Sequence, residues 1–274
     1  MKISVVTVSL NSANTIERTI LSVVGQDYDP IEYIVVDGRS KDRTMEIVRA
    51  YRRHIELVIS EEDDGIYDAM NKGLRMATGD VVGFLNSDDE YVDRRVLGKV
   101  ASRIEGGGLD AVYGDLVYVA RHNRQRITRR WTAGPYRPGG FARGWVPPHP
   151  TFFCCRATYE KYGGFNRQFR VAGDFELMLR FIQCHQIRLG YIPEVLARMR
   201  AGGKANTLAG MLRGQREIRQ AFRVNGLPYP LQIAVRRPLS RIPQIIRGHC
   251  AADTLAKPAE IPSKIEDAVA PVAE

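Results

Sequence analysis

A short apolar segment that ends in four small polar residues constrains the fold of this chain most. Val81-Val82-Gly83-Phe84-Leu85 contains no polar side chain and runs directly into Asn86-Ser87-Asp88-Asp89. An unbroken apolar run of this length is typical of a strand that is buried on both faces of a parallel sheet. Because open α/β sheets bind ligands outside the carboxyl ends of their strands, we expect these four residues to border a ligand site.

The two adjacent carboxylates of this segment indicate a divalent cation. A bound cation relieves the repulsion between Asp88 and Asp89, and oxygen ligands suit Mg²⁺ or Mn²⁺ better than zinc. The alternative is a strand followed by an ordinary Asx turn, which would be the favoured interpretation of an isolated Asn-Ser-Asp-Asp. The segments before and after it favour the ligand site.

The first third of the chain alternates between strand and helix patterns. Apolar, strand-like runs and helix-like runs with apolar residues three or four apart follow one another at 2–10, 16–24, 31–36, 45–51, 57–60, 66–77 and 81–85. This alternation predicts an α/β fold with a parallel sheet and right-handed crossovers. Neither G-x-G-x-x-G nor G-x-x-x-x-G-K-[ST] occurs, which argues against a dinucleotide-binding or P-loop protein.

The second half of the chain is less regular. We expect a strand over 111–119 that pairs with 126–131, a long loop rich in Gly and Pro over 134–150, and short strands over 151–155 and 187–192. Helices are expected over 174–185 and 208–224, the second of them basic and amphipathic. The final residues, 251–274, contain too little apolar side-chain surface to fold alone.

Charge and cysteine content limit the partners and the compartment. The net charge is +9, although the last 24 residues carry two Lys against five acidic residues, so the remainder is more basic still. Such a surface can face nucleic acid, anionic lipid or phosphorylated small molecules. The four cysteines show no C-x-x-C spacing, and neither a signal peptide nor an eighteen-residue apolar run occurs, so we expect a cytoplasmic protein with reduced thiols.

Five motifs, in a fixed order along residues 3–200, together resemble the family 2 glycosyltransferases. The matching segments are Val5–Asn11, Val35–Thr44, Asp64–Gly73, Ala77–Asp80 and Phe84–Asp89. The resemblance implies a GT-A nucleotide-diphospho-sugar transferase fold, with a mainly parallel central sheet, flanking helices and a C-terminal helical extension. It implies a glycosyltransferase domain over 1–205, whose nucleotide-sugar half is 1–105 and whose acceptor half is 106–205. A basic helical extension over 206–250 and a disordered tail over 251–274 would follow.

The same resemblance assigns residues to the donor site. It places Ser9, Asn11 and Asp37 at the nucleotide base and ribose, and Asn86 and Ser87 beside the nucleotide-sugar. Asp88 matches the last position of the family's D-x-D turn and would bind Mg²⁺ or Mn²⁺, while Asp89 would support the turn.

Four of these positions depart from the family pattern or carry an open alternative. Asp37 can also be a turn residue that caps the following helix, and both roles can hold at once. The D-x-D turn begins with Asn86 instead of Asp, which removes one charge from the metal site. Asp68 and Lys72 match positions beside the nucleotide-sugar, but their i, i+4 spacing on one helix equally predicts an ion pair.

The acceptor side rests on fewer positions. Asp174 matches the family's catalytic base, which takes a proton from the acceptor hydroxyl, although it can also cap its helix and Glu176 is an alternative base. His149 matches a family region close to the acceptor, with a structural role as the alternative, and Lys204 is a candidate phosphate contact.

These assignments predict a metal-dependent inverting glycosyltransferase of the hexosyltransferase type. It would move a single sugar, from a UDP-sugar by preference, to a hydroxyl acceptor such as a lipid-linked saccharide, in cell-surface polysaccharide or glycolipid synthesis. The basic C-terminal region is compatible with peripheral attachment to an anionic membrane at its cytosolic face. A non-catalytic nucleotide-sugar-binding scaffold is the alternative; a nucleotidyltransferase lacks its phosphate loop here, and a nucleic-acid binder lacks a recognised module.

Overall fold

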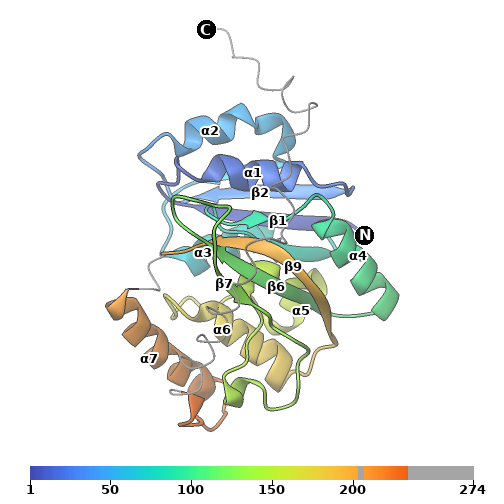
Figure 1. Ribbon diagram of the computed structural model, residues 1–274, viewed down its shortest axis with the longest axis vertical. Helices are drawn as coiled ribbons and strands as arrows, with labels where there is room; N and C mark the ends of the chain where they lie inside the picture. The colour runs from blue at the N-terminus through green and yellow to red at the C-terminus, as the bar shows by residue number, and fades with distance from the viewer. Residues whose placement is uncertain (203–206, 234–274) are drawn as a thin grey trace.

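The computed structural model describes residues 1–202 and 207–233, which form one nine-stranded sheet with helices on both faces (Figure 1). The strands are β1 (Ile3–Ser9), β2 (Ile31–Asp37), β3 (Leu57–Ser60), β4 (Val81–Phe84), β5 (Glu90–Tyr91), β6 (Ala111–Val119), β7 (Ile127–Trp131), β8 (Phe153–Cys155) and β9 (Leu189–Arg200). The α-helices are α1 (Ile16–Val24), α2 (Thr44–Ala50), α3 (Ile66–Met76), α4 (Val96–Gly107), α5 (Arg156–Tyr162), α6 (Gly173–Met178) and α7 (Leu208–Val224). Shorter helical segments are η1 (Arg52–His54), η2 (Phe141–Arg143), η3 (His149–Thr151) and the π-helical η4 (Leu179–Cys184).

The first four strands form the predicted parallel sheet. Their spatial order is β3-β2-β1-β4, and every neighbouring pair among them is parallel. The order continues as β8-β6-β9-β5, with β7 paired to β6. Because β8 is antiparallel to both β4 and β6, the second half of the sheet is mixed. The predicted α/β fold is confirmed.

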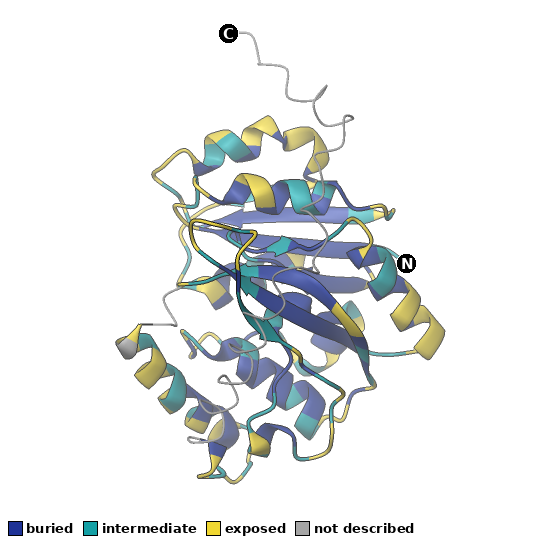
Figure 2. Ribbon diagram, in the orientation of Figure 1, coloured by how far each residue is buried: buried dark blue, intermediate teal, exposed yellow. Residues whose placement is uncertain are grey.

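Both faces of β1, β2 and β4 are buried, which explains their largely apolar sequences, whereas the edge strand β3 is only partly buried. In β1, Ile3 and Val5 pack in one core with α1, α2 and α4, whereas Val6 and Val8 pack in a second core with α3, α5 and α6. Figure 2 shows the strands in the colour of buried residues and the outward faces of the helices in that of exposed ones. A strand between two helical layers has no solvent-facing side on which polar residues would alternate.

Three expected elements differ in their bounds. The strand expected over 151–155 begins only at Phe153, because Pro148 and Pro150 lead into the single turn of η3. The helix expected over 174–185 becomes π-helical at Leu179. The short strand expected over 187–192 is the twelve-residue β9, in which a bulge absorbs Pro193 and Glu194 so that pairing with β6 continues.

The predicted basic helix over 208–224 is confirmed as α7, which packs against α6 (Figure 1). The remaining part of the expected extension, 234–250, the expected tail over 251–274 and Lys204 lie outside the described residues. None of the described helices combines the length and the apolar composition that a bilayer span requires. Cys154, Cys155 and Cys184 are free thiols.

Candidate active site

The carboxyl ends of β1, β2 and β4 bring the predicted donor-site residues together at one edge of the sheet. Ser9 ends β1 directly beside Asp37 at the end of β2. The turn after β4 joins them, because the amide of Ser87 donates to the carbonyl of Val8 at 3.2 Å and the hydroxyls of Ser12 and Ser87 lie 2.7 Å apart. Residues that are far apart in the sequence therefore border one site, as the parallel topology requires.

Asp37 is fully buried, and its carboxylate accepts hydrogen bonds from residues of several neighbouring segments. Its carboxylate oxygens accept from the hydroxyl of Ser9 at 3.0 Å, the hydroxyl of Ser60 at 3.0 Å, and the amide of Ser40 at 2.8 Å. The hydroxyl of Ser40 is a fourth donor. A buried carboxylate is stable only when it is hydrogen-bonded in this way, so Asp37 fixes the ends of β1, β2 and β3 relative to one another.

Asn11 joins the loops that follow β1 and β2. It has a left-handed backbone with φ of 51°, a conformation that Asn tolerates better than most residues. Its side-chain oxygen accepts from the amide of Lys41 at 2.9 Å, and its own amide donates to the hydroxyl of Ser40 at 2.8 Å. Asn11 thus lies at the rim of the edge that Ser9 and Asp37 form.

The turn over residues 86–89 holds buried acceptors that lack donors. Within the described part of the chain, neither carboxylate oxygen of the fully buried Asp89 nor the side-chain oxygen of Asn86 has a hydrogen-bond partner. Burial raises the pKa of Asp89 well above its ordinary value, and the neighbouring charge of Asp88 raises it further. Burial also raises the pKa of Asp88, against the opposing charges of Arg200 and Arg124. The Asp89 carboxyl and the Asn86 amide oxygen, which lack donors, are acceptors that a hard divalent cation or a proton would satisfy.

This donor set fits a metal ion that takes most of its ligands from elsewhere. No three His, Cys, Asp or Glu side chains gather as a metal-binding group among residues 1–202 and 207–233. Mg²⁺ and Mn²⁺ commonly use one or two protein carboxylates together with substrate phosphates and water. Asp88, with Asn86 beside it, therefore suits such an ion when a diphosphate is present.

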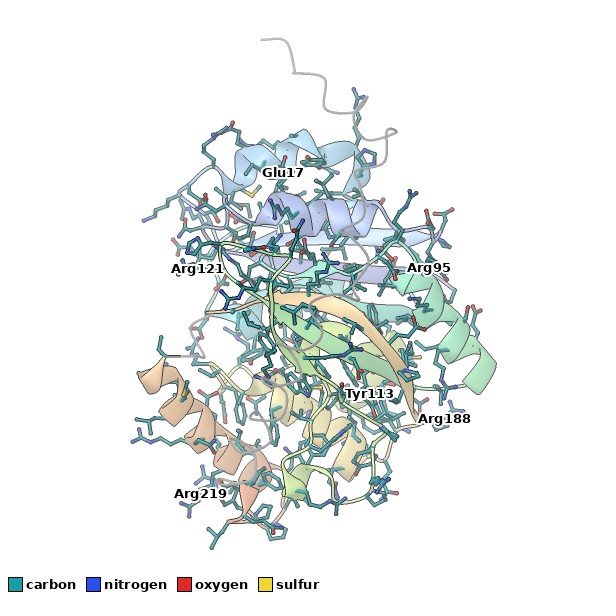
Figure 3. All side chains as sticks on the ribbon, viewed as in Figure 1. Glu17, Arg95, Tyr113, Arg121, Arg188 and Arg219 are labelled. Atoms are coloured by element: carbon teal, nitrogen blue, oxygen red, sulfur yellow. The ribbon has the colours of Figure 1, made fainter. Side chains whose placement is uncertain are left out.

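Arg124 is a residue of this site that sequence reasoning did not single out. It lies in the loop between β6 and β7, close to residues 86–90, and its side chain is only 13% exposed. The guanidinium pairs with Glu90 at 3.0 Å and donates to the carbonyl of Asp88 at 3.3 Å. The concentration of arginine over 121–130 indicated a basic segment, and Figure 3 shows Arg121 in the same loop, but nothing in the sequence indicated which arginine turns inward.

Asp68 and Lys72 form the expected ion pair, but a long one, with 3.8 Å between Lys72 Nζ and Asp68 Oδ2. Closer partners are Glu61 for Lys72, at 2.9 Å, and Arg167 for Asp68, at 3.1 Å. Asp68 also accepts from the amide of Asp64 at 3.0 Å. These contacts organise the start of α3, and a role beside a nucleotide-sugar stays a prediction.

Asp174 is the second residue of α6, and its side chain is oriented by α3. The hydroxyl of Tyr67 donates to Asp174 Oδ1 at 3.2 Å. Burial, and next the charge of Asp174, raise the pKa of Tyr67 well above its ordinary value, so this hydroxyl stays a donor at neutral pH. Glu176, the alternative base, is almost completely buried and pairs with Arg180 at 2.9 Å, which favours Asp174 as the carboxylate that reaches a substrate.

A cluster of rings, which we call the bridging cluster, connects the turn after β4 with Asp174. It consists of Phe84, His149, Phe165 and Tyr67. Phe84 stacks on His149 with ring centroids 6.3 Å apart and meets the face of Phe165 at 5.0 Å, and Phe165 stacks on Tyr67 at 5.6 Å. His149 Nε2 is buried and has no partner among the described residues, and burial lowers the pKa of His149. At neutral pH His149 is therefore an uncharged part of this cluster, and a contact with the acceptor stays a prediction.

Comparisons with known proteins point to one family. The model of the family "Glycosyl transferase family 2" matches residues 4–161. A "PGL/p-HBAD biosynthesis glycosyltransferase" of Mycobacterium bovis BCG is 29% identical over 211 residues, which cover 75% of this chain and 79% of that protein.

Two solved structures show the same fold. TarS 1–349 of S. aureus in complex with UDP is 20% identical, with a TM-score of 0.63, and the match covers 86% of this chain and 68% of TarS 1–349. The mannosyltransferase PcManGT of Pyrobaculum calidifontis, in complex with GDP-Man and Mn²⁺, is 22% identical, with a TM-score of 0.62, and the match covers 97% of this chain and 79% of PcManGT.

Proposed function

The chain belongs to glycosyltransferase family 2, and from this membership we propose that it transfers a single sugar from a nucleotide-diphosphate sugar to a hydroxyl acceptor with inversion. The observation that carries the proposal is the turn over residues 86–89, which holds buried acceptors without donors and is bonded through Ser87 to the sheet edge that Ser9 and Asp37 border. The bridging cluster joins this turn to Asp174. In this proposal residues 1–105 bind the donor and residues 106–205 bind the acceptor.

Asp174 is the proposed catalytic base. Its carboxylate takes the proton of the acceptor hydroxyl while the acceptor oxygen attacks C1 of the sugar from the face opposite the diphosphate. The bond between C1 and the diphosphate oxygen breaks, and the nucleoside diphosphate leaves with the electron pair, so that the configuration at C1 inverts. Tyr67, which donates to Asp174 Oδ1, leaves Oδ2 to accept the proton.

Asp88, with Asn86 and Ser87 beside it, is the proposed holder of Mg²⁺ or Mn²⁺ at the donor diphosphate. A bound ion there would neutralise the charge that develops on the leaving diphosphate. Ser9, Asn11, Asp37, Asp68 and Lys72 shape the pocket for the nucleotide and its sugar. The structural neighbours support this proposal, since TarS was solved with UDP and PcManGT with GDP-Man and Mn²⁺. We favour a UDP-sugar as the donor.

The acceptor is proposed to be a saccharide or lipid-linked saccharide of the cell surface. The mycobacterial relative is named for PGL/p-HBAD biosynthesis, which supports a role in glycolipid or polysaccharide assembly. The outward face of α7 supports a location at the cytosolic side of an anionic membrane. It exposes Leu212 by 56% beside exposed arginines at 213, 216, 219 and 223. Figure 3 shows Arg219 on this helix.

Release of nucleotide from a panel of UDP-, GDP- and dTDP-sugars, with Mg²⁺, Mn²⁺ or EDTA, tests the proposal. We expect metal-dependent release from one donor, and a loss of roughly 100-fold or more in Asp88→Ala and Asp174→Ala. Asp27→Asn is the matched control, because Asp27 lies before β2, at the opposite edge of the sheet, and its side chain is 51% exposed.

One outcome would contradict the proposed activity, and another the proposed metal ligand. Donor binding by calorimetry without turnover, in the presence of a panel of saccharide acceptors, would favour a nucleotide-sugar-binding scaffold, the alternative that Asn86 in the D-x-D turn motivates. Equal turnover in Asp88→Ala and in the wild type would reject Asp88 as the metal ligand.

A further inference from the structure

Glu217 is a buried carboxylate that α7 directs at the residues just before α6. Its exposed fraction is 7%, and it lies on the inner face of α7 together with Ile218 and Ala221. Glu217 Oε2 accepts from the amides of Val171 and Ala172, both at 2.8 Å. The amide of Arg170 lies 3.1 Å from each of the two carboxylate oxygens.

These three amides form a natural binding site for a negative charge. Successive backbone N–H groups that point into one concavity attract an anion, and the positive end of the following helix strengthens the attraction. The helix α6 begins at Gly173, and no side chain at its N-cap position, Ala172, supplies an acceptor. Glu217 accepts from the amide of this N-cap residue and from the two amides before it, so a carboxylate from a different part of the chain holds the backbone that leads into α6.

The same segment is anchored on its other side to the donor half. The guanidinium of Arg170 pairs with Asp64 Oδ1 at 2.8 Å and donates to the carbonyl of Asp64. Gly173 packs so closely on Tyr67 that an added Cβ would lie 2.8 Å from a ring atom. The backbone that carries Asp174 is thus held by α7 through Glu217 and by the start of α3 through Arg170 and Tyr67.

We propose that Glu217 is a positioning residue for Asp174, so that α7 sets the geometry of the catalytic base. This inference rests on the proposed function, in which Asp174 accepts the proton of the acceptor. It gives a catalytic purpose to a helix that lies beyond residues 4–161, the segment that the family model matches. Misplacement of a base by about 1 Å costs roughly 100-fold in rate even when the substrates still bind.

Steady-state kinetics of Glu217→Ala and Glu217→Gln, with the donor that the wild type uses, test this inference. We expect kcat to fall roughly 10- to 100-fold in Glu217→Ala, with the KM and the calorimetric Kd of the donor within about twofold of the wild type. Glu217→Gln keeps the shape of the side chain and one acceptor oxygen, so its kcat should lie between that of the wild type and that of Glu217→Ala. Gln220→Ala, a truncation on the same helix, should keep the wild-type kcat. Hydrogen exchange at the amides of 170–172 should accelerate in Glu217→Ala and stay slow in Gln220→Ala.

The outcomes separate this inference from the proposed function. A wild type that turns over no donor would reject the proposed function itself. With an active wild type, a kcat within about twofold in Glu217→Ala would overturn the positioning role. A loss of donor affinity together with kcat, or equal losses in the Ala and Gln variants, would instead assign Glu217 a general structural role and would also overturn it.

Discussion

Asp89 is a residue of the candidate site that we expect to destabilise the folded protein at neutral pH. Folding buries its carboxyl group, which has no hydrogen-bond partner among the described residues. Burial, and then the charge of Asp88, raise the pKa of Asp89 well above that of an exposed aspartate. A carboxyl group whose pKa is higher in the folded state than in the unfolded state binds its proton more tightly after folding. Its contribution to the free energy of unfolding is therefore full at low pH and is lost as the pH rises above the unfolded pKa, about 4.

We therefore expect Asp89→Asn to stabilise the metal-free protein at pH 7, by about 1–2 kcal/mol, because the amide carries no charge to bury. Thermal unfolding in EDTA between about pH 4 and pH 8 measures the effect, and the decline with pH should be shallower in the variant. Addition of Mn²⁺ should raise the Tm of the wild type more than that of the variant. A variant whose Tm is lower than that of the wild type at pH 7 in EDTA would contradict this account.

At the scale of elements, α3 is fixed to the sheet by a glycine. An added Cβ at Gly73 would lie 2.3 Å from a methyl carbon of Val6 in β1 and 3.3 Å from one of Val36 in β2. The close approach places Tyr67 and Asp68, at the start of α3, beside the candidate site. Neither valine can yield easily, because both are fully buried.

We expect Gly73→Ala to lower the free energy of unfolding by about 1–3 kcal/mol, through overpacking that exceeds the gain in helix propensity. Gly106→Ala is the control, because nothing lies within 4 Å of an added Cβ at Gly106 in α4, and it should be neutral or stabilising by up to about 1 kcal/mol. Chemical denaturation of both variants measures the difference. Equal stability of the two variants would show that α3 moves away from β1 without cost.

The sequence predicted best those strands that can be recognised from their own run of consecutive apolar residues. The run over 81–85 and the alternation before it predicted β1 to β4, because β1, β2 and β4 are buried on both faces and the edge strand β3 partly so. The full length of β9 was missed because Pro193 and Glu194 read as the end of a strand, whereas pairing with β6 carries them as a bulge.

The residues of the candidate site likewise include some that the sequence predicted and some that it did not. Ser9, Asp37 and the residues over 86–89 follow strands directly, so topology alone brings them together. Tyr67, Arg124 and Glu217 contact the site from α3, a hairpin loop and α7. Their contacts depend on how distant elements pack, which periodicity and motif spacing do not record.

At the scale of the whole molecule, the membrane attachment proposed above depends on the charge that α7 carries. Figure 1 shows α7 and α2 at opposite ends of the described molecule. The outward face of α7 combines four exposed arginines with exposed Leu212, whereas its inward face holds Glu217, Ile218 and Phe222. A basic helix with apolar side chains on its outer surface binds anionic lipid through both charge and burial. The opposite face of the same helix holds the segment before Asp174, so a membrane-bound α7 would present the proposed base at a fixed height above the lipid.

We expect the protein to co-sediment with phosphatidylglycerol vesicles and not with phosphatidylcholine vesicles, and to be released by salt. Replacing Arg213, Arg216 and Arg223 with Gln should weaken binding by about 100-fold, at about 1 kcal/mol for each charge lost near the surface. The control replaces the exposed arginines 43, 49 and 53 of α2 and η1, which removes the same charge at the other end of the molecule. Equal weakening in both triple variants would show that net charge alone drives binding. A further variant, Leu212→Ser, tests the apolar contribution of α7, and unchanged vesicle binding in this variant would reject that contribution.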